Sequence, residues 1–166
     1  MPSGCDPSRG RQNDSRLPLH RAPKNAVAMT PHQTELVIQT RGRGFHEITR
    51  EVTAWVRATG IQTGLCTLFL RHTSASLVIQ ENADPDVRRD FDTYFADLVP
   101  DGWRRFIHTA EGDDDMPAHI LSALMGVHLS IPIREGELAL GTWQGIYVWE
   151  HRKTPHSRRV VVHGNG

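Results

Sequence analysis

The spacing of apolar and polar positions changes several times along the chain, and each change marks an expected secondary-structure element. Residues 34–40, TELVIQT, alternate as a short strand does, and Gly42 and Gly44 follow as turn residues. From Ile48 the apolar positions recur at helical spacing, and Gly60 suits the C-terminal cap of that helix. This part of the chain therefore predicts a strand followed by a helix.

The next segment predicts two strands and a second helix. Residues 63–72, TGLCTLFLRH, are apolar at nearly every position, which indicates a strand buried on both faces. Residues 76–80, SLVIQ, predict another strand. Asp84 and Pro85 then provide an N-cap and a first helical position, and helical spacing continues to Leu98.

A third helix opens within residues 111–119, EGDDDMPAH, with Pro117 in its first turn and Gly126 as its stop. Four apolar segments follow it, VHLSIPI, ELAL, TWQGIYVWEH and RRVVVH, and they predict a run of strands. Helices and strands do not alternate regularly. We therefore expect an α+β fold with a largely antiparallel, sandwich-like sheet and about three helices, in a single domain over residues 29–166. Residues 1–28 lack apolar periodicity, and we expect them to form a flexible N-terminal tail.

The overall composition narrows the classes of partner. The 19 basic residues balance the 19 acidic ones, so no large field of one sign attracts nucleic acid or an anionic membrane. No apolar run approaches the ~18 residues that span a bilayer. Cys5 and Cys66 lie far apart, and Cys66 sits in an apolar run that suits a buried free thiol. We expect a cytoplasmic protein without nucleic-acid or membrane partners.

The segment EGDDDMPAH concentrates negative charge, with Glu111, Asp113, Asp114 and Asp115 in five consecutive positions. A helix N-terminus favours one or two acids, which accounts for Asp115 and Asp114. The remaining carboxylates repel their neighbours unless a cation or a strong donor lies among them. A solvated acidic loop, screened by water, is the alternative interpretation.

Two histidines flank this acidic segment. His108 precedes it, and His119 lies four residues after Asp115, so its imidazole can face the loop. Carboxylates and imidazoles near a helix N-terminus suit a divalent metal, or a diphosphate bridged by one. Carboxylates favour Mg²⁺ or Mn²⁺, whereas several histidines favour Zn²⁺, and the spacing leaves the metal open.

Further polar residues occur where predicted strands end. His72 and Ser74 follow a buried strand directly, where chemistry is often placed but where a structural histidine is equally common. Asn82 and Asp84 lie at the start of a predicted helix. Asp84 has an adequate role as the N-cap, whereas Asn82 is a candidate for ligand contact.

The segment GTWQGIYVWEHR, residues 141–152, contains the unusual polar insertion Gln144. Glu150 and His151 end the predicted strand within it, and they are either a metal ligand with its supporting acid or an exposed pair without a role.

Three of these motifs together resemble a known family. RHTSASLVIQENADPDV, EGDDDMPAHI and LGTWQGIYVWEHR, in this order and at these separations, resemble the YjbQ-like family, described as secondary thiamine-phosphate synthases. The resemblance covers roughly residues 30–163. It implies a compact α+β domain, a homotrimer with sites near subunit boundaries, and coupling of a hydroxymethylpyrimidine diphosphate to a thiazole phosphate with release of pyrophosphate. That activity is regarded as weak for the family, so the physiological substrate is left open.

The resemblance also implies roles for individual residues. We predict catalytic residues at His72, Glu111 and Asp114, with His72 as proton donor to the leaving group. The predicted metal ligands are His108, His119, His151 and Asp115. The predicted contacts to a small phosphorylated substrate are Ser74, Asn82, Asp84, Thr142, Gln144 and Arg152.

Two other functions fit the same residues. One is a metal-dependent hydrolase of a small phosphorylated metabolite, in which water takes the place of the second substrate. The other is a non-catalytic trimer that binds a metal or a metabolite. The sequence contains no cofactor fingerprint that separates the three.

Overall fold

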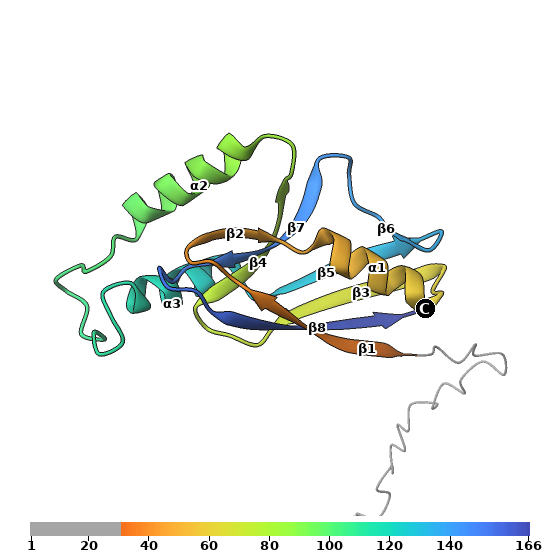
Figure 1. Ribbon diagram of the computed structural model, residues 1–166, viewed down its shortest axis with the longest axis horizontal. Coiled ribbons are helices and arrows are strands. Elements are labelled where there is room, and N and C mark those ends of the chain that lie inside the picture. Colours follow the sequence, from red (N-terminus) through yellow and green to blue (C-terminus); the bar gives the residue numbers. More distant parts are fainter. Residues whose placement is uncertain (1–30) are drawn as a thin grey trace, which may run out of the picture.

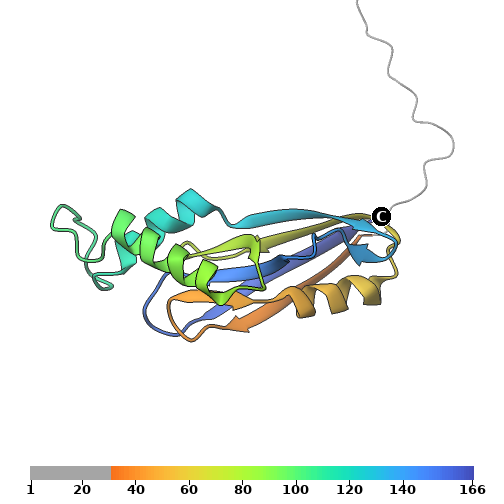
Figure 2. The same cartoon turned by 90° about the horizontal axis from the view of Figure 1, so that it is seen from above.

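Two antiparallel sheets and three helices make up residues 31–166, the part of the chain that the computed structural model describes (Figures 1 and 2). The larger sheet contains, in spatial order, β1 (His32–Gln39), β8 (Ser157–Asn165), β3 (Thr63–Leu70), β5 (His128–Arg134) and β6 (Glu137–Leu138). The smaller sheet contains β2 (Gly44–Glu47), β7 (Gln144–Glu150) and β4 (Ala75–Glu81). The helices are α1 (Thr49–Thr59), α2 (Pro85–Leu98) and α3 (Asp115–Met125). The predicted α+β class, antiparallel pairing and three helices are confirmed, whereas the predicted tail, residues 1–28, lies outside the described residues.

The predicted helix ends are found in the structure. Gly60 closes α1 in the left-handed conformation, with φ of 75°. Asp84 caps α2, because its side chain accepts a hydrogen bond from the backbone N–H of Asp86 at 2.8 Å. Strand β2 was not predicted, since it has four residues and begins at Gly44, which the sequence marks as a turn.

One face of the five-stranded sheet packs on α1 and on the three-stranded sheet. The core between them is aliphatic and includes Val52, Val56, Cys66, Leu68, Leu77, Ile131, Ile146, Val148, Val160 and Val162. Cys66 is fully buried and free, and burial raises the pKa of its thiol to about 11. The prediction of a buried free thiol is confirmed.

The other face of this sheet corrects one prediction. Strand β3 was expected to be buried on both faces, but Leu65 and Phe69 are 39% and 49% exposed. Val37, on β1 of the same sheet, is 51% exposed. An apolar pattern on both faces requires a layer on each side, and residues 31–166 supply only one.

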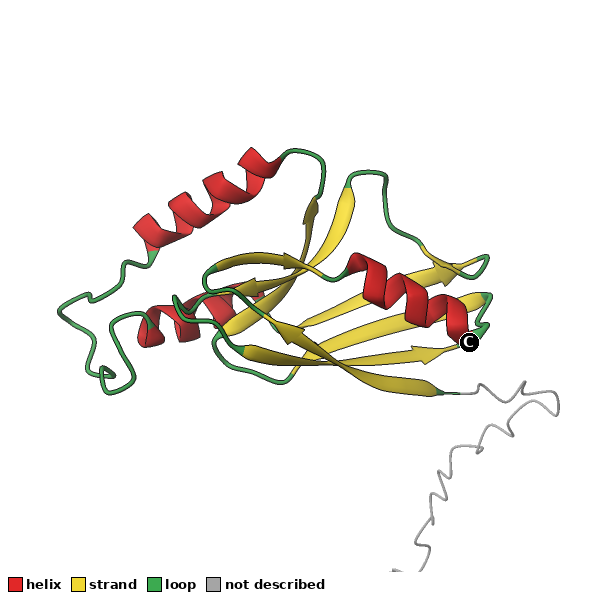
Figure 3. Ribbon diagram, viewed as in Figure 1, coloured by secondary structure: helices red, strands yellow, loops and turns green. Residues whose placement is uncertain are grey.

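Helix α2 stands away from the five-stranded sheet and contains no fully buried residue (Figure 3). It is held through Phe91 and Phe95, whose rings lie 6.0 Å and 5.2 Å from the ring of Trp149 on β7. The Trp149 indole N–H also donates to Asp92 at 2.8 Å. The loop between α2 and α3 projects at one end of the molecule (Figures 1 and 2). Within residues 31–166, no helix has the length and apolar character needed to cross a membrane.

Candidate functional site

The acidic segment at the start of α3 meets cations from the connection between β7 and β8. Arg152 donates through Nη1 to one carboxylate oxygen of Asp115 and through Nε to Asp114 at 3.2 Å. The Lys153 ammonium lies 3.1 Å from Asp113 and 3.1 Å from Asp101. Much of the positive charge expected among these carboxylates is therefore supplied by the chain itself.

Asp114 is buried by this arrangement. Its side chain makes no capping hydrogen bond to α3, contrary to expectation, and instead accepts the backbone N–H of Lys153 at 2.7 Å. Burial by itself raises the pKa of Asp114, but the hydrogen bonds from Lys153 and Arg152 outweigh it and hold the pKa below its ordinary value. Asp114 is thus ionised and joins two segments distant in sequence.

The Arg152 guanidinium makes its hydrogen bonds to the acidic segment. In addition to Asp114 and Asp115, it donates through Nη2 to the backbone carbonyl of Glu111 at 2.7 Å, and its side chain is only 11% exposed. The predicted phosphate contact by Arg152 remains a prediction. In this structure its donors hold Asp115 in place. The Glu111 side chain is exposed and has no hydrogen-bond partner among residues 31–166.

Two of the predicted histidine ligands and one acid come together. His108 donates through Nε2 to Asp115 Oδ2 at 2.7 Å, and Nε2 of His119 lies 3.4 Å from the same oxygen. Asp115 and His119 are four residues apart on α3 and so share one helix face. One ligand atom from each of the three residues lies within 4.8 Å of the others. We call this group the triad.

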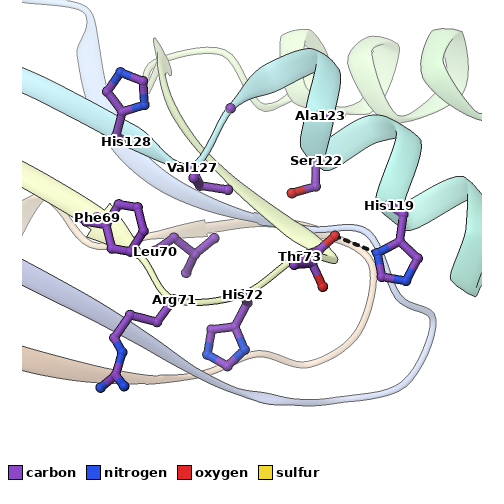
Figure 4. A pocket seen from close by; sticks show the side chains of 11 residues that line it. Phe69, Leu70, Arg71, His72, Thr73, His119, Ser122, Ala123, Val127 and His128 are labelled. Atoms are coloured by element: carbon purple, nitrogen blue, oxygen red, sulfur yellow. Dashed lines mark hydrogen bonds between the residues drawn. The ribbon is translucent and has the colours of Figure 1, made fainter.

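The tautomer of His119 follows from its second contact. Its Nδ1 lies 3.0 Å from the backbone carbonyl of Thr73, which can only accept, so Nδ1 carries a proton (Figure 4). In a neutral imidazole Nε2 then presents a lone pair toward the Asp115 carboxylate. A cation bound between this lone pair and the carboxylate oxygen 3.4 Å away would relieve their repulsion, as would a second proton on the ring. Metal-binding histidines commonly make this second hydrogen bond to a backbone carbonyl.

The donor set of the triad fits a metal. Two imidazoles and one carboxylate are the ligands of many zinc sites and of other transition-metal sites. Mg²⁺, with its preference for oxygen ligands, suits this set less well than Zn²⁺ or Mn²⁺. His108, His119 and Asp115 are therefore the residues that would hold a divalent metal.

His151 lies apart from the triad, contrary to its prediction as a ligand. It is 1% exposed, packs edge-on against Trp149, and its Nε2 lies 2.8 Å from Ser76 Oγ. Burial lowers the pKa of His151 to about 3, so the ring is neutral. It belongs to the interior of the fold.

Next to His151 lies a buried ion pair, Glu150 with Arg158, which the sequence did not predict. Glu150 and Arg158 are 0% and 3% exposed, and Arg158 Nε donates to Glu150 Oε2 at 2.7 Å. Thr40 also donates to this carboxylate, and Arg158 donates to Ser74 Oγ at 3.1 Å. Burial opposes ionisation of Glu150, but these donors hold its pKa below the ordinary value. The sequence contained one indication of this burial. Arg158 and Val160 are two residues apart on one strand, so they share a face, and Val160 faces inward.

His72 lines a pocket at the C-terminal end of β3. This pocket, here called the strand pocket, has a volume of about 680 Å³. Its lining includes Leu70, His72, Thr73, His119, Ser122 and Val127. Figure 4 shows His72, Thr73 and His119 toward one end of it. His72 Nε2 accepts the backbone N–H of Arg159 at 2.9 Å, and burial and Arg158 lower the pKa of His72. A neutral His72 therefore keeps its proton on Nδ1.

Four predicted substrate contacts lie at the other end of the β4–β7 pair. Residues 81 and 144 are register partners at one end, and residues 75 and 150 at the other, so the two groups are roughly 20 Å apart along the strands. Gln144 accepts the Gly141 N–H at 2.8 Å, and Asn82 donates its backbone N–H to Trp143. Asn82, Asp84, Thr142 and Gln144 thus do not join the triad within one chain.

We expect Arg152→Lys to weaken metal binding at the triad by about 10- to 100-fold, because lysine keeps the charge but cannot bridge two carboxylates. The measurement is competition for Zn²⁺ with a chromophoric chelator. The matched control is Lys153→Gln, which removes a half-exposed neighbouring cation and should change the affinity by less than about threefold. Equal losses in both variants would show that only net charge matters.

We also expect the free energy of unfolding to decrease as the pH falls through the range in which histidines titrate. Since the pKa of His151 drops from 6.5 to about 3 on folding, the unfolded chain binds a proton below pH 6.5 that the folded chain does not. The free energy of unfolding then decreases by up to about 1.4 kcal/mol per pH unit. His72 acts in the same direction, whereas Glu150 and Asp114, whose pKa values are lowered from 4.5 and 3.8, contribute only below about those ordinary values.

Urea unfolding between about pH 7 and about pH 5 measures this slope. His151→Gln keeps a polar contact for Ser76 and removes the titration, so its slope should be shallower. A slope identical to that of the unaltered chain would mean that His151 is not the titrating group.

Comparison with known proteins supports a family assignment. Residues 34–166 match the family described as UPF0047 protein YjbQ-like. A UPF0047 protein from Synechocystis is 54% identical over 142 residues, covering 86% of this chain and 97% of its own length. The UPF0047 protein YjbQ from Salmonella typhimurium is 45% identical over 132 residues, covering 79% and 95%.

Solved structures agree with this assignment. A YbjQ-like protein of unknown function from Sulfolobus solfataricus superposes with a TM-score of 0.75 at 27% identity, covering 84% of this chain and 99% of that one. A conserved hypothetical protein from Thermus thermophilus gives 0.69 at 38% identity, covering 77% and 97%. From its sequence and its fold, this chain belongs to the YjbQ-like family, UPF0047.

Proposed function

We propose that the chain holds a divalent metal at the triad and acts as a secondary thiamine-phosphate synthase. The substrates would be a hydroxymethylpyrimidine diphosphate and a thiazole phosphate. The observation that carries the metal part is the orientation of His119. Its protonated Nδ1 is held by Thr73, so Nε2 faces the Asp115 oxygen that His108 also contacts. The reaction is the one that the resemblance to the YjbQ-like family implies.

In this reaction the thiazole nitrogen forms a bond to the pyrimidine CH₂ carbon while the bond from that carbon to the diphosphate oxygen breaks. A bound divalent metal would supply charge stabilisation for the departing pyrophosphate. His72 lines the strand pocket together with His119, and its protonated Nδ1 could donate a hydrogen bond or a proton to a leaving oxygen. Arg152 keeps Asp115 oriented toward both histidines.

We further propose a cytoplasmic homotrimer whose sites lie near subunit boundaries. The outer face of the five-stranded sheet exposes Leu65 and Phe69 on a central strand, which suits contact with another copy. The separation of Gln144 from the triad also suits a site completed by a second copy. Light scattering on Phe69→Glu should give a smaller mass than the unaltered chain, and an unchanged mass would place the contact elsewhere.

The test of the function supplies both substrates together with Zn²⁺, Mn²⁺ or Mg²⁺ and identifies the products. Thiamine phosphate with pyrophosphate supports the proposal. Inorganic phosphate without coupled product indicates the metal-dependent hydrolase. Binding without turnover of either substrate indicates the non-catalytic trimer. His119→Ala should remove the metal-dependent part of any activity found.

A further inference from the structure

A second pocket lies next to the triad, in the loop between α2 and α3. It has a volume of about 350 Å³. Its lining includes Trp103, Arg104, Phe106, His108 and Asp113, and the Asp113 carboxylate is paired with Lys153. We call this second pocket the loop pocket. His108 belongs to this pocket, whereas His119 belongs to the strand pocket, and their ring centres are 5.5 Å apart. The triad therefore lies where the two pockets approach each other.

Arg104 lines the loop pocket, and Arg105 is its neighbour in the sequence. Within residues 31–166, neither Arg104 nor Arg105 lies within salt-bridge distance of a carboxylate. Among the acids of this loop, Asp101 binds Arg43 in a bidentate pair and Asp113 binds Lys153, whereas the exposed Glu111 side chain has no hydrogen-bond partner among residues 31–166. Exposed guanidinium groups beside an imidazole favour a ligand that carries oxyanions.

The same pocket also presents a flat aromatic surface. Trp103 is 47% exposed, and its ring meets Phe106 edge-on at 5.1 Å. The Arg105 guanidinium lies over the Trp103 ring, 5.3 Å from its centre. A large exposed indole beside unpaired guanidinium groups suits a planar heteroaromatic ring that carries phosphate.

The loop that forms this pocket is held by internal hydrogen bonds. Gly102 donates its backbone N–H to Asp113 at 2.9 Å, which closes the base of the loop, and Phe106 donates to Trp103 at 2.9 Å. Gly102 has φ of 63°, a conformation that favours glycine. Because the loop is organised before a ligand arrives, binding loses little free energy to ordering.

We propose that the loop pocket binds the phosphorylated heteroaromatic substrate. The diphosphate would contact Arg104 and reach the triad past His108, and the ring would lie against Trp103. The strand pocket is then left for the second substrate. This inference rests on the proposed function, because it assigns one of the two substrates of that reaction to a place beside the metal.

The test is calorimetric titration of the full chain with inorganic pyrophosphate, once with Zn²⁺ and once in the presence of a chelator. Arg104→Gln should weaken pyrophosphate binding about tenfold or more in both conditions. The matched control is Arg50→Gln, because Arg50 is also exposed and lines a separate pocket on α1. It should leave the affinity unchanged. Affinity for Zn²⁺, measured separately, should stay within about twofold in both variants.

The ring contact has its own test. Trp103→Leu should weaken binding of hydroxymethylpyrimidine diphosphate about tenfold while changing pyrophosphate binding by less than about threefold. Pyrophosphate binding that is equal in Arg104→Gln, Arg50→Gln and the unaltered chain overturns the proposal. Failure of the triad to bind metal would instead overturn the proposed function, and the titration with chelator would still decide whether the loop pocket takes the anion.

Discussion

Replacing Arg158 with methionine is expected to lower the free energy of unfolding by about 3–5 kcal/mol. The substitution leaves the Glu150 carboxylate ionised at 0% exposure with its main cation removed. It also removes the donor to Ser74, which lies next to the Thr73 carbonyl that orients His119. Since a typical domain is stable by about 5–15 kcal/mol, this is a large share of the total. Urea unfolding followed by circular dichroism measures the change.

Two variants make the Arg158 result interpretable. The double variant Arg158→Met, Glu150→Leu removes both charges and should recover much of the lost stability, because no unpaired charge remains buried. Arg57→Ala breaks an ion pair with Glu137 whose side chains are 63% and 50% exposed. That change should cost less than about 1 kcal/mol. A loss in Arg158→Met as small as in Arg57→Ala would mean that Glu150 is solvated or protonated.

Replacing His119 with alanine should weaken Zn²⁺ binding by at least about 100-fold, because one of the three proposed ligands is lost and supporting contacts alone are worth 10- to 100-fold. A second measurement does not depend on catalysis. Zn²⁺ at about 100 times its dissociation constant should stabilise the unaltered chain against unfolding by about 2.7 kcal/mol, and this gain should vanish in the variant.

The control for His119 is another histidine of the same pocket. His128 is exposed at the start of β5 and lines the strand pocket, but it is not part of the triad (Figure 4). His128→Ala should therefore keep both the Zn²⁺ affinity and the stabilisation. If His119→Ala retained the affinity of the unaltered chain, the metal centre would be refuted.

The elements of this fold were predictable where local pattern and caps agree. Helix α2 begins at Pro85 after the capping Asp84, and α1 ends at Gly60, as their residue types favour. Strand β2 escaped prediction because four residues after a glycine turn carry too little pattern. The expectation for β3 was wrong in one respect, since an apolar pattern does not reveal whether the covering layer belongs to the same chain.

The candidate site was predictable only in part. His108, Asp115 and His119 lie within twelve consecutive residues at a helix start, so spacing could place them together. Arg152 approaches them from more than thirty residues away, and its pairing with Asp114 and Asp115 depends on how the β7–β8 connection passes the start of α3. His151 has the residue type of a ligand, but its position on a buried strand turns it inward to Ser76.

The sequence by itself determined the class of fold, the helix ends and the grouping of two histidines with an acid, because each of these can be read from the local pattern and spacing of residues. The tertiary structure alone decided which charges meet. It joined Glu150 to Arg158 in the core, brought Arg152 and Lys153 to the acidic segment, and turned His119 onto Thr73. A charge buried without a partner costs several kcal/mol, so partners must be present, but which residues serve depends on distances across the folded chain.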